Sequence, residues 1–130
     1  MKQIEEIRAF FANDRFATEN GMAIDQVGES SAVCSLVIQP KHRNAVGGVM
    51  GGVPFTLADF AYAVATNHEE PRWVSLSSNI TFTGMAKGEK LIATATCVKS
   101  GRSTNYYTVC VADELGNKVA EVTVTGFCKG

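Results

Sequence analysis

A run of apolar residues near the middle of the chain constrains its fold more than any other feature. Between residues 55 and 65 only Thr56 and Asp59 are polar. The preceding Gly51-Gly52 pair supplies a turn, and Pro54 fits a first helical turn because its missing N–H would have no partner there. We therefore expect a helix that begins at this turn and runs to about Asn67. A helix without a polar side needs the rest of the chain to enclose it.

Asp59 is the residue that does not fit this pattern. It places a carboxylate within an apolar run, where removing a charge from water is costly unless the group has a partner or a task. The other interpretation is a hydrogen-bonded or partly solvated aspartate that the helix dipole favours. Asp59 is therefore a candidate functional residue.

The composition is that of one folded domain, which we expect to span residues 1–130. Hydrophobic residues make up 45% and charged residues 19%, which excludes a disordered chain. The net charge of -1 attracts neither nucleic acid nor a membrane surface, so we expect no partner of either kind. No stretch approaches the roughly eighteen consecutive apolar residues that a membrane-spanning helix needs.

The N-terminus and the cysteines predict a cytoplasmic protein. Acidic residues interrupt the N-terminal segment, where a secretory signal needs an unbroken apolar core. None of the four cysteines form a C-x-x-C pair, so we expect buried free thiols in a reducing compartment. The cysteines are Cys34, Cys97, Cys110 and Cys128.

The remaining periodicities predict mostly strands. Residues 74–82 alternate, with Val74, Leu76, Ser78, Ile80 and Phe82 expected on one face. The expected elements are a short helix over 2–12, strands over 22–28 and 32–39, the central helix, and strands over 74–82, 91–100, 104–112 and 118–127. Consecutive strands with short turns form an antiparallel sheet, and an apolar helix needs a curved one. We expect an α+β hotdog fold, in which the sheet wraps around the central helix.

Several familiar site motifs are absent. The chain has only two histidines, His42 and His68, so a metal cluster is not expected. The glycine-rich GGVMGG lacks the Lys-Ser/Thr of a phosphate-binding loop, and no G-x-S-x-G elbow is present.

The Gly51-Gly52 turn and Asp59 together suggest acyl transfer. A helix N-terminus has free N–H groups and a partial positive charge, which suit a carbonyl oxygen that becomes an oxyanion. A carboxylate further along the helix is placed to activate water. The alternative is that the glycines serve chain geometry alone.

A longer string of residues resembles a known family. Asn44-x-x-Gly47-x-x-Met50-Gly51-Gly52-x-x-x-x-Leu57-Ala58-Asp59 is similar to the signature of hotdog acyl-CoA thioesterases of the phenylacetate-pathway (PaaI-like) type. The likeness continues in VSLSSNITF from Val74 to Phe82. It implies hydrolysis of an acyl-CoA to a carboxylic acid and CoA, with no metal or redox cofactor.

The resemblance also implies a role for individual residues. Asn44 and the N–H of Gly51 would polarise the thioester carbonyl, Asp59 would act as general base or nucleophile, and Ser75 would position water. The site would lie between the subunits of a homodimer or homotetramer, with the amide and glycine from one subunit and the aspartate from the other. Without the family, Asn44 is equally well a loop-capping amide and Ser75 a plain strand hydroxyl.

Substrate-binding residues are expected on both sides of this site. Relatives have histidine where this chain has Met50, whose thioether donates no hydrogen bond but adds apolar surface near the acyl group. Gly52 lies beside it at the helix start. Lys99 and Arg102 flank the Gly101 turn, where relatives place a segment that contacts CoA, although a solvated turn explains them equally well.

Two other functions remain open at this point. A non-catalytic domain that binds or senses acyl-CoA would keep the pocket with weakened chemistry, and Met50 favours it. A hotdog dehydratase or hydratase would need a histidine in the site, and neither His42 nor His68 is suitably placed.

Overall fold

The expected central helix is α3, which spans Gly52–Asn67 in the computed structural model of residues 1–130. The chain forms, in order, α1 (Ile4–Phe11), α2 (Arg15–Glu19), β1 (Ala23–Val27), β2 (Ser31–Val37), the 3-10 turn η1 (Pro40–His42), α3, β3 (Trp73–Phe82), β4 (Lys90–Ser100), β5 (Thr104–Asp113) and β6 (Lys118–Cys128). No helix is long and apolar enough to cross a membrane.

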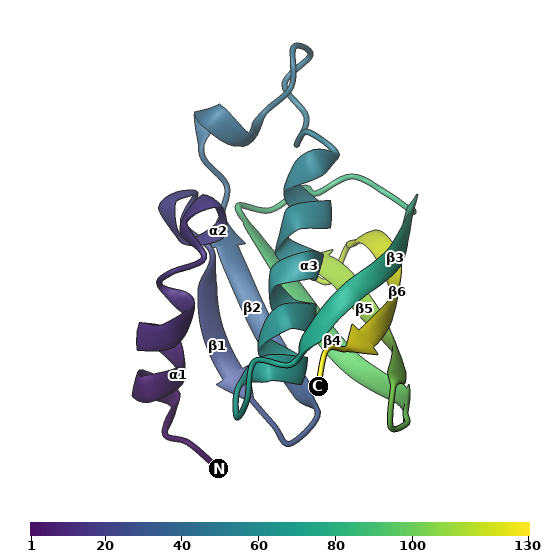
Figure 1. The fold of residues 1–130 in the computed structure, drawn as a ribbon. Coiled ribbons are helices and arrows are strands. Elements are labelled where there is room, and N and C mark those ends of the chain that lie inside the picture. The colour runs from purple at the N-terminus through teal and green to yellow at the C-terminus, as the bar shows by residue number, and fades with distance from the viewer.

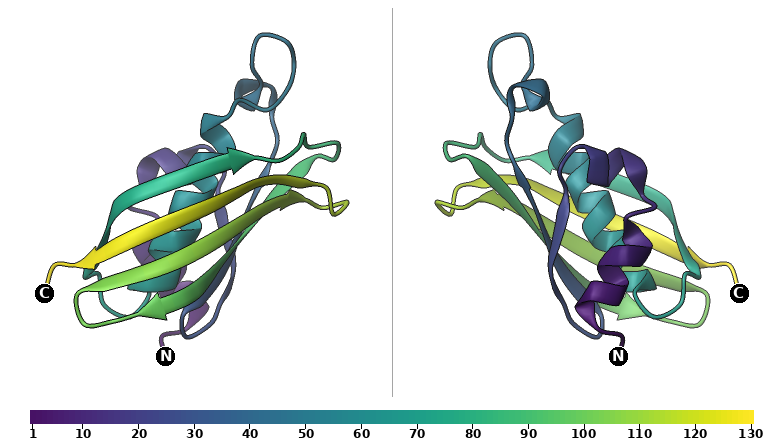
Figure 2. Two further views of the ribbon diagram at one scale, coloured as in Figure 1. Left: turned by 90° about the vertical axis from the view of Figure 1, so that its right-hand side faces the viewer. Right: turned by 90° about the vertical axis from the view of Figure 1, so that its left-hand side faces the viewer.

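One antiparallel sheet of six strands, in the order β1-β2-β4-β5-β6-β3, curves around α3 (Figure 1). Side views show α3 lying in the hollow of the sheet, with α1 and α2 beside it (Figure 2). Leu57, Ala58, Ala61 and Val64 are completely buried on the covered side of the helix. The predicted hotdog fold is confirmed, because the apolar helix drives the sheet to close around it.

The enclosure of α3 is less complete than the sequence suggests. Asp59 is exposed, and Phe55, Thr56 and Ala63 are only half-buried. These four residues recur about every turn of the helix and form an open stripe that the sheet of a single chain does not cover. The expectation of a helix wrapped on all sides is therefore wrong for one chain.

The segment after α1 also differs from the prediction. We expected no helix or strand between residues 12 and 22, whereas Arg15–Glu19 forms the separate helix α2. Five residues are too few to show a helical period, so contacts elsewhere in the chain decide this element. At the end of α1, Phe10 is exposed, while Phe11 packs edge-on against Phe60 with ring centroids 6.1 Å apart.

Strand β3 is present, and Ser78, Ile80 and Phe82 share one face as predicted, but the alternation is broken before Ser77. The register with β6 shifts at Leu76, so that Ser75 pairs with Gly126 and Ser77 pairs with Thr125. Cross-strand partners share a face, and a bulge adds one residue to one strand. Ser75 therefore faces α3 on the same side as Ser78, whereas Val74, paired with Phe127, faces outwards. No residue of this edge strand is buried.

A buried polar contact joins α3 to the sheet. The hydroxyl of Tyr62 donates a hydrogen bond to Oδ1 of Asn105 at 2.9 Å, and both residues are buried. A Cβ at Gly126 would overlap both of these oxygen atoms. The hydroxyl and the amide thus occupy the space that a larger residue would need.

We predict that Gly126→Ala lowers the free energy of unfolding by about 1–3 kcal/mol, because the methyl group overpacks this contact. Gly101→Ala is the matched control, since its Cβ would meet only the Thr104 carbonyl oxygen at 3.5 Å. Urea denaturation of both variants measures the difference. Equal stability of the two variants would show that the residues around Gly126 move to accept a methyl group without loss of free energy of unfolding.

Candidate active site

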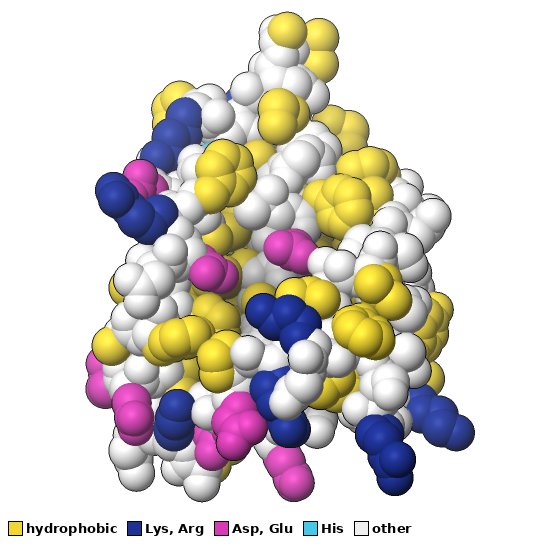
Figure 3. Space-filling view, in the orientation of Figure 1, with side chains coloured by type: hydrophobic (Ala, Val, Ile, Leu, Met, Phe, Trp, Pro, Cys, Tyr) yellow, Lys and Arg dark blue, Asp and Glu magenta, His cyan; other side chains and the backbone are white.

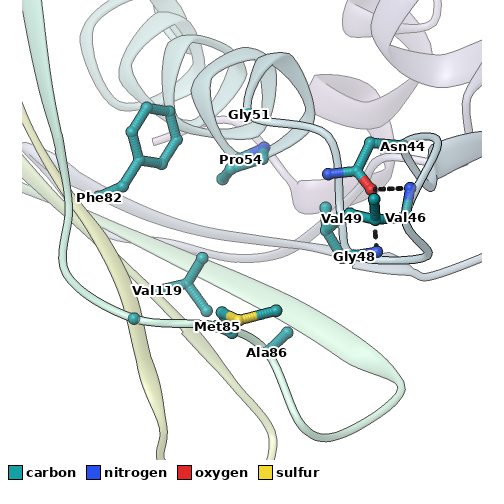
Figure 4. Close-up of a pocket in the computed structure, with 11 residues that line it drawn as sticks. Asn44, Val46, Gly48, Val49, Gly51, Pro54, Phe82, Met85, Ala86 and Val119 are labelled. Carbon is teal, nitrogen blue, oxygen red and sulfur yellow. Dashed lines mark hydrogen bonds between the residues drawn. The ribbon is translucent and has the colours of Figure 1, made fainter.

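The residues expected at the site line separate cavities around α3. Asn44 and Gly51 face a cavity of about 330 Å³, here called the donor cavity (Figure 4). Its lining residues are Asn44, Val46, Gly48, Val49, Gly51, Pro54, Phe82, Gly84, Met85, Ala86 and Val119. Asp59 lines none of this space. The structure therefore brings Asn44 and Gly51 together and leaves the aspartate elsewhere in the same chain.

Asn44 both caps its loop and keeps a free donor. Its Oδ1 accepts hydrogen bonds from the N–H groups of Val46 at 3.0 Å and Gly48 at 3.1 Å, while Gly47 takes the left-handed backbone conformation between them. The Nδ2 group of Asn44 has no acceptor in the chain, and Figure 4 shows it on the opposite side from these two bonds. The hydrogen bonds to Oδ1 thus orient the amide and leave its Nδ2 group available to donate to a ligand.

The start of α3 presents two more donors. The N–H groups of Gly51 and Gly52 have no acceptor within the chain, as expected at the first turn of a helix. A Cβ at Gly51 would lie 2.9 Å from Cζ of Phe82, so glycine also allows β3 to approach the helix. The N–H of Gly51 therefore adds an unpaired donor to the positive end of the helix dipole.

One connection that lines the donor cavity is held by a buried carboxylate. Oδ2 of Asp113 accepts hydrogen bonds from the N–H groups of Lys87 at 2.8 Å and Gly88 at 3.0 Å, next to the lining residues Met85 and Ala86. Burial by itself would raise the pKa of Asp113, but hydrogen bonds from the Asn117 amide and from these N–H groups outweigh it and lower the pKa. The carboxylate therefore stays ionised and keeps the connection between β3 and β4 in place.

Asp59 lies eight residues beyond Gly51, about 12 Å along the helix axis. Its carboxylate accepts no hydrogen bond from the chain and faces the open side of α3. Loss of surrounding water, and then repulsion from the Asp14 carboxylate, raises the pKa of Asp59 above its usual 3.8. It is an ionisable group without a partner, and in one chain it is too far from Gly51 to act on the same atom.

Two serines of β3 lie beside Asp59. Ser75 lines a cavity of about 240 Å³ with Asp59 and Tyr62, and Ser78 lines another of about 410 Å³ with Asp59 and Phe16. Sequence reasoning singled out Ser75 but missed Ser78, Tyr62 and Phe16. The strand pattern placed Ser75 and Ser78 on opposite faces, and only the bulge at Leu76 brings both to the helix.

Met50 faces away from the donor cavity. Its side chain is 52% exposed and lines a cavity of about 340 Å³ with Phe16, Met22 and Val53. Gly52 lines the same space, where its Cβ would meet Cε of Met50 at 3.0 Å. The thioether therefore adds apolar surface on the α2 side of the helix start.

Lys99 and Arg102 lie far from the donor cavity in the same chain. Both are exposed at the turn between β4 and β5, and neither forms an ion pair. This turn borders the Trp73 end of β3, since Cys128, the partner of Trp73, donates its N–H to the Ser103 carbonyl. Gly51 meets the opposite end of β3 at Phe82.

The candidate metal ligands do not assemble. No three His, Cys, Asp or Glu side chains converge on a common point. All four cysteines are free thiols; Cys34 is buried as expected, whereas Cys97, Cys110 and Cys128 are only half-buried.

The sequence and the structure of this chain are both similar to those of known proteins. Residues 46–120 match the model of the thioesterase superfamily. The acyl-coenzyme A thioesterase PaaI of Escherichia coli is 30% identical over 121 residues, which are 92% of this chain and 86% of that protein. The structure of the E. coli PaaI protein from the phenylacetic acid degradation operon has a TM-score of 0.90 and 26% identity, covering 97% of this chain and 92% of the other.

A second solved structure is similar. That of smu.793 from Streptococcus mutans, bound to acetyl CoA, has a TM-score of 0.77 and 26% identity, covering 85% of this chain and 90% of the other. The hotdog architecture, the match over more than half of the chain and these relatives show that the chain belongs to the thioesterase superfamily, as a thioester hydrolase of the PaaI-like type.

Proposed function

We propose that this protein hydrolyses an acyl-CoA to a carboxylic acid and CoA at a site shared between two copies of the chain. The observation that carries the proposal is the separation along α3. Free donors from Asn44 and Gly51 face one cavity, and the unpartnered carboxylate of Asp59 lies about 12 Å further along. The donors lack a nearby base, and the Asp59 carboxylate lacks nearby donors for a carbonyl oxygen. A CoA thioester as the substrate is supported by the name of the PaaI relative and by the acetyl CoA bound in the S. mutans structure.

The proposed chemistry uses each group once. Asp59 of one copy takes a proton from water, and the resulting hydroxide attacks the thioester carbon. The carbonyl oxygen becomes an oxyanion that accepts hydrogen bonds from the Gly51 N–H and the Asn44 Nδ2 of the other copy. Collapse of the tetrahedral intermediate breaks the C–S bond and releases the CoA thiolate, which takes up the proton, together with the carboxylic acid. Ser75 and the newly noted Ser78 are placed to hold the water near Asp59.

The proposed contact between copies lies at β3 and the open stripe of α3. β3 is an edge strand with unpaired backbone groups, and Leu76 and Phe82 are exposed on it. Antiparallel association of two such edges is isologous and brings the Phe82 end of one copy towards the Trp73 end of the other. A homodimer, or a homotetramer of two such dimers, would therefore complete two sites at once. Lys99 and Arg102 remain proposed contacts for the CoA phosphates.

A domain that binds acyl-CoA without hydrolysing it is the second candidate. The specific observation in its favour is that Met50 supplies no hydrogen-bond donor at the helix start and its side chain lines the cavity on the α2 side. Asp59 distinguishes the two candidates, since only hydrolysis requires its carboxylate.

We predict that Asp59→Asn lowers kcat by about 10²–10⁴-fold, the usual contribution of a positioned general base, while binding of a non-hydrolysable acyl-CoA thioether is preserved. In the wild type kcat should rise with pH along a limb whose midpoint lies above 3.8, because the pKa of Asp59 is raised and the base works only when deprotonated. That limb should be absent in the variant. Thiol release across pH measures both effects, and undiminished hydrolysis by a folded Asp59→Asn protein would remove the carboxylate from the mechanism.

The shared site predicts complementation between two inactive variants. Asn44→Ala and Asp59→Asn should each be inactive alone. When they are co-expressed, half of the dimers are mixed and each contains one intact site of two, so roughly a quarter of the wild-type activity should return. The double variant Asn44→Ala/Asp59→Asn, co-expressed with wild type, controls for expression level. If the mixed population stays inactive, each site is built from a single chain.

A further inference from the structure

We infer that α2 forms the wall of the subsite for the acyl group, and that Phe16 selects a neutral, apolar acyl group for hydrolysis. This inference rests on the proposed function. It adds that the acyl group of the substrate binds on the side of α3 that faces α2. The sequence analysis assigned no role to α2.

Phe16 lies where three hollows meet. Its side chain is 72% exposed, yet it lines cavities of about 280, 340 and 410 Å³ on the open side of α3. Thr56 lines the same three cavities, and Asp59, one helical turn later, lines two of them. The three cavities share Phe16 and Thr56 as walls and follow α3 from the Asp59 carboxylate to Met50, and together they are here called the path.

Side-chain hydrogen bonds attach the end of α2 to Lys41 and His42, which precede Asn44 of the donor cavity in the sequence. Nδ1 of His42 accepts the N–H of Gln39 at 2.9 Å, so Nε2 carries the ring hydrogen and donates it to the Asn20 carbonyl at 3.1 Å. Nζ of Lys41 donates to the Glu19 carbonyl at 3.3 Å. Ala17 is buried beneath the helix. These contacts fix the backbone that carries Phe16 despite the exposure of its ring.

The chemistry of the walls favours an apolar occupant. Beyond Thr56 the apolar side chains that line the path are those of Met22, Met50 and Val53. The polar lining residues there are Asn20, Lys41 and His42, and the side chains of Lys41 and His42 donate to backbone carbonyls at the end of α2. Figure 3 shows hydrophobic side chains gathered on this face over α2, the start of α3 and β3, with acidic side chains among them.

The charged groups along the path disfavour an anionic acyl group. Asp14 and Asp59 line it with negative charge, and each of their pKa values is raised by loss of water. The guanidinium of Arg15 is paired with Glu19. Lys41 lies at the Met50 end of the path, where its Nζ donates to the Glu19 carbonyl at 3.3 Å. A second carboxylate on an acyl group that lies beside Asp14 and Asp59 would therefore meet repulsion. A saturated chain or an aromatic ring would bury apolar surface against Phe16 and Met50.

The test measures acyl selectivity with a matched pair of variants. Wild type, Phe16→Ala and the control Phe10→Ala are assayed for thiol release from acetyl-, hexanoyl-, benzoyl- and succinyl-CoA, and Kd is measured for the corresponding non-hydrolysable thioethers. Phe10 is also an exposed aromatic residue, but it lines none of the three cavities. Phe16→Leu serves as a second variant that keeps an apolar wall.

We predict that wild type prefers hexanoyl- and benzoyl-CoA to acetyl- and succinyl-CoA. Phe16→Ala should lower kcat/KM and thioether affinity for hexanoyl and benzoyl groups by about tenfold, and for the acetyl group by less than about twofold, because a methyl group does not reach the wall. Phe16→Leu should retain most of the hexanoyl preference, and Phe10→Ala should match wild type.

Equal effects of Phe16→Ala on all acyl groups, or no effect on any, would overturn the inference even if wild type is an active thioesterase. Altered selectivity in thioether binding would support it even if Asp59→Asn remained active, an outcome that overturns only the proposed mechanism. A wild-type protein that neither hydrolyses nor binds any member of the panel would overturn both proposals.

Discussion

The burial of α3 against a curved sheet is the interaction on which the rest of the structure depends. Leu57, Ala58, Ala61 and Val64 give the sheet an apolar surface to close around, and this fixes where both ends of the helix lie. The helix start is held beside Phe82 of β3, and Gly51, whose N–H has no acceptor in the chain, lines the donor cavity there. The same closure leaves one stripe of the helix uncovered, and Asp59 lies on that stripe.

The geometry of the helix keeps the donors and the carboxylate of one chain apart. Donors at a helix N-terminus are fixed by the backbone, and a carboxylate on the same helix eight residues later cannot be moved closer by any change of rotamer. In the proposed dimer, association of two antiparallel copies would resolve this distance by combining the start of one helix with the middle of the other. It would also cover the open stripe and the edge of β3, where Leu76 and Phe82 are exposed.

Different parts of the chain are then responsible for chemistry and for selectivity in the proposed function. The groups proposed to act on the thioester come from the loop at Asn44, from α3 and from β3, all of which are held by the core or by backbone hydrogen bonds. The wall of the proposed acyl subsite comes from α2, a short helix attached through His42 and Lys41. A change at Phe16 can alter the subsite without disturbing the core, since the ring is exposed and packs against no other aromatic residue.

The central helix, the antiparallel strands that follow it and the family could all be predicted from the amino-acid sequence. Those features depend on local periodicity and on the spacing from Asn44 to Asp59, both of which are written in consecutive residues. Only the tertiary structure decided which faces meet. The bulge at Leu76 turns Ser75 towards α3, five residues fold as α2 because of distant contacts, and Met50 lines the cavity beside Phe16 rather than the one beside Asn44. No local pattern encodes these outcomes, because each depends on the register and packing of segments that are far apart in the chain.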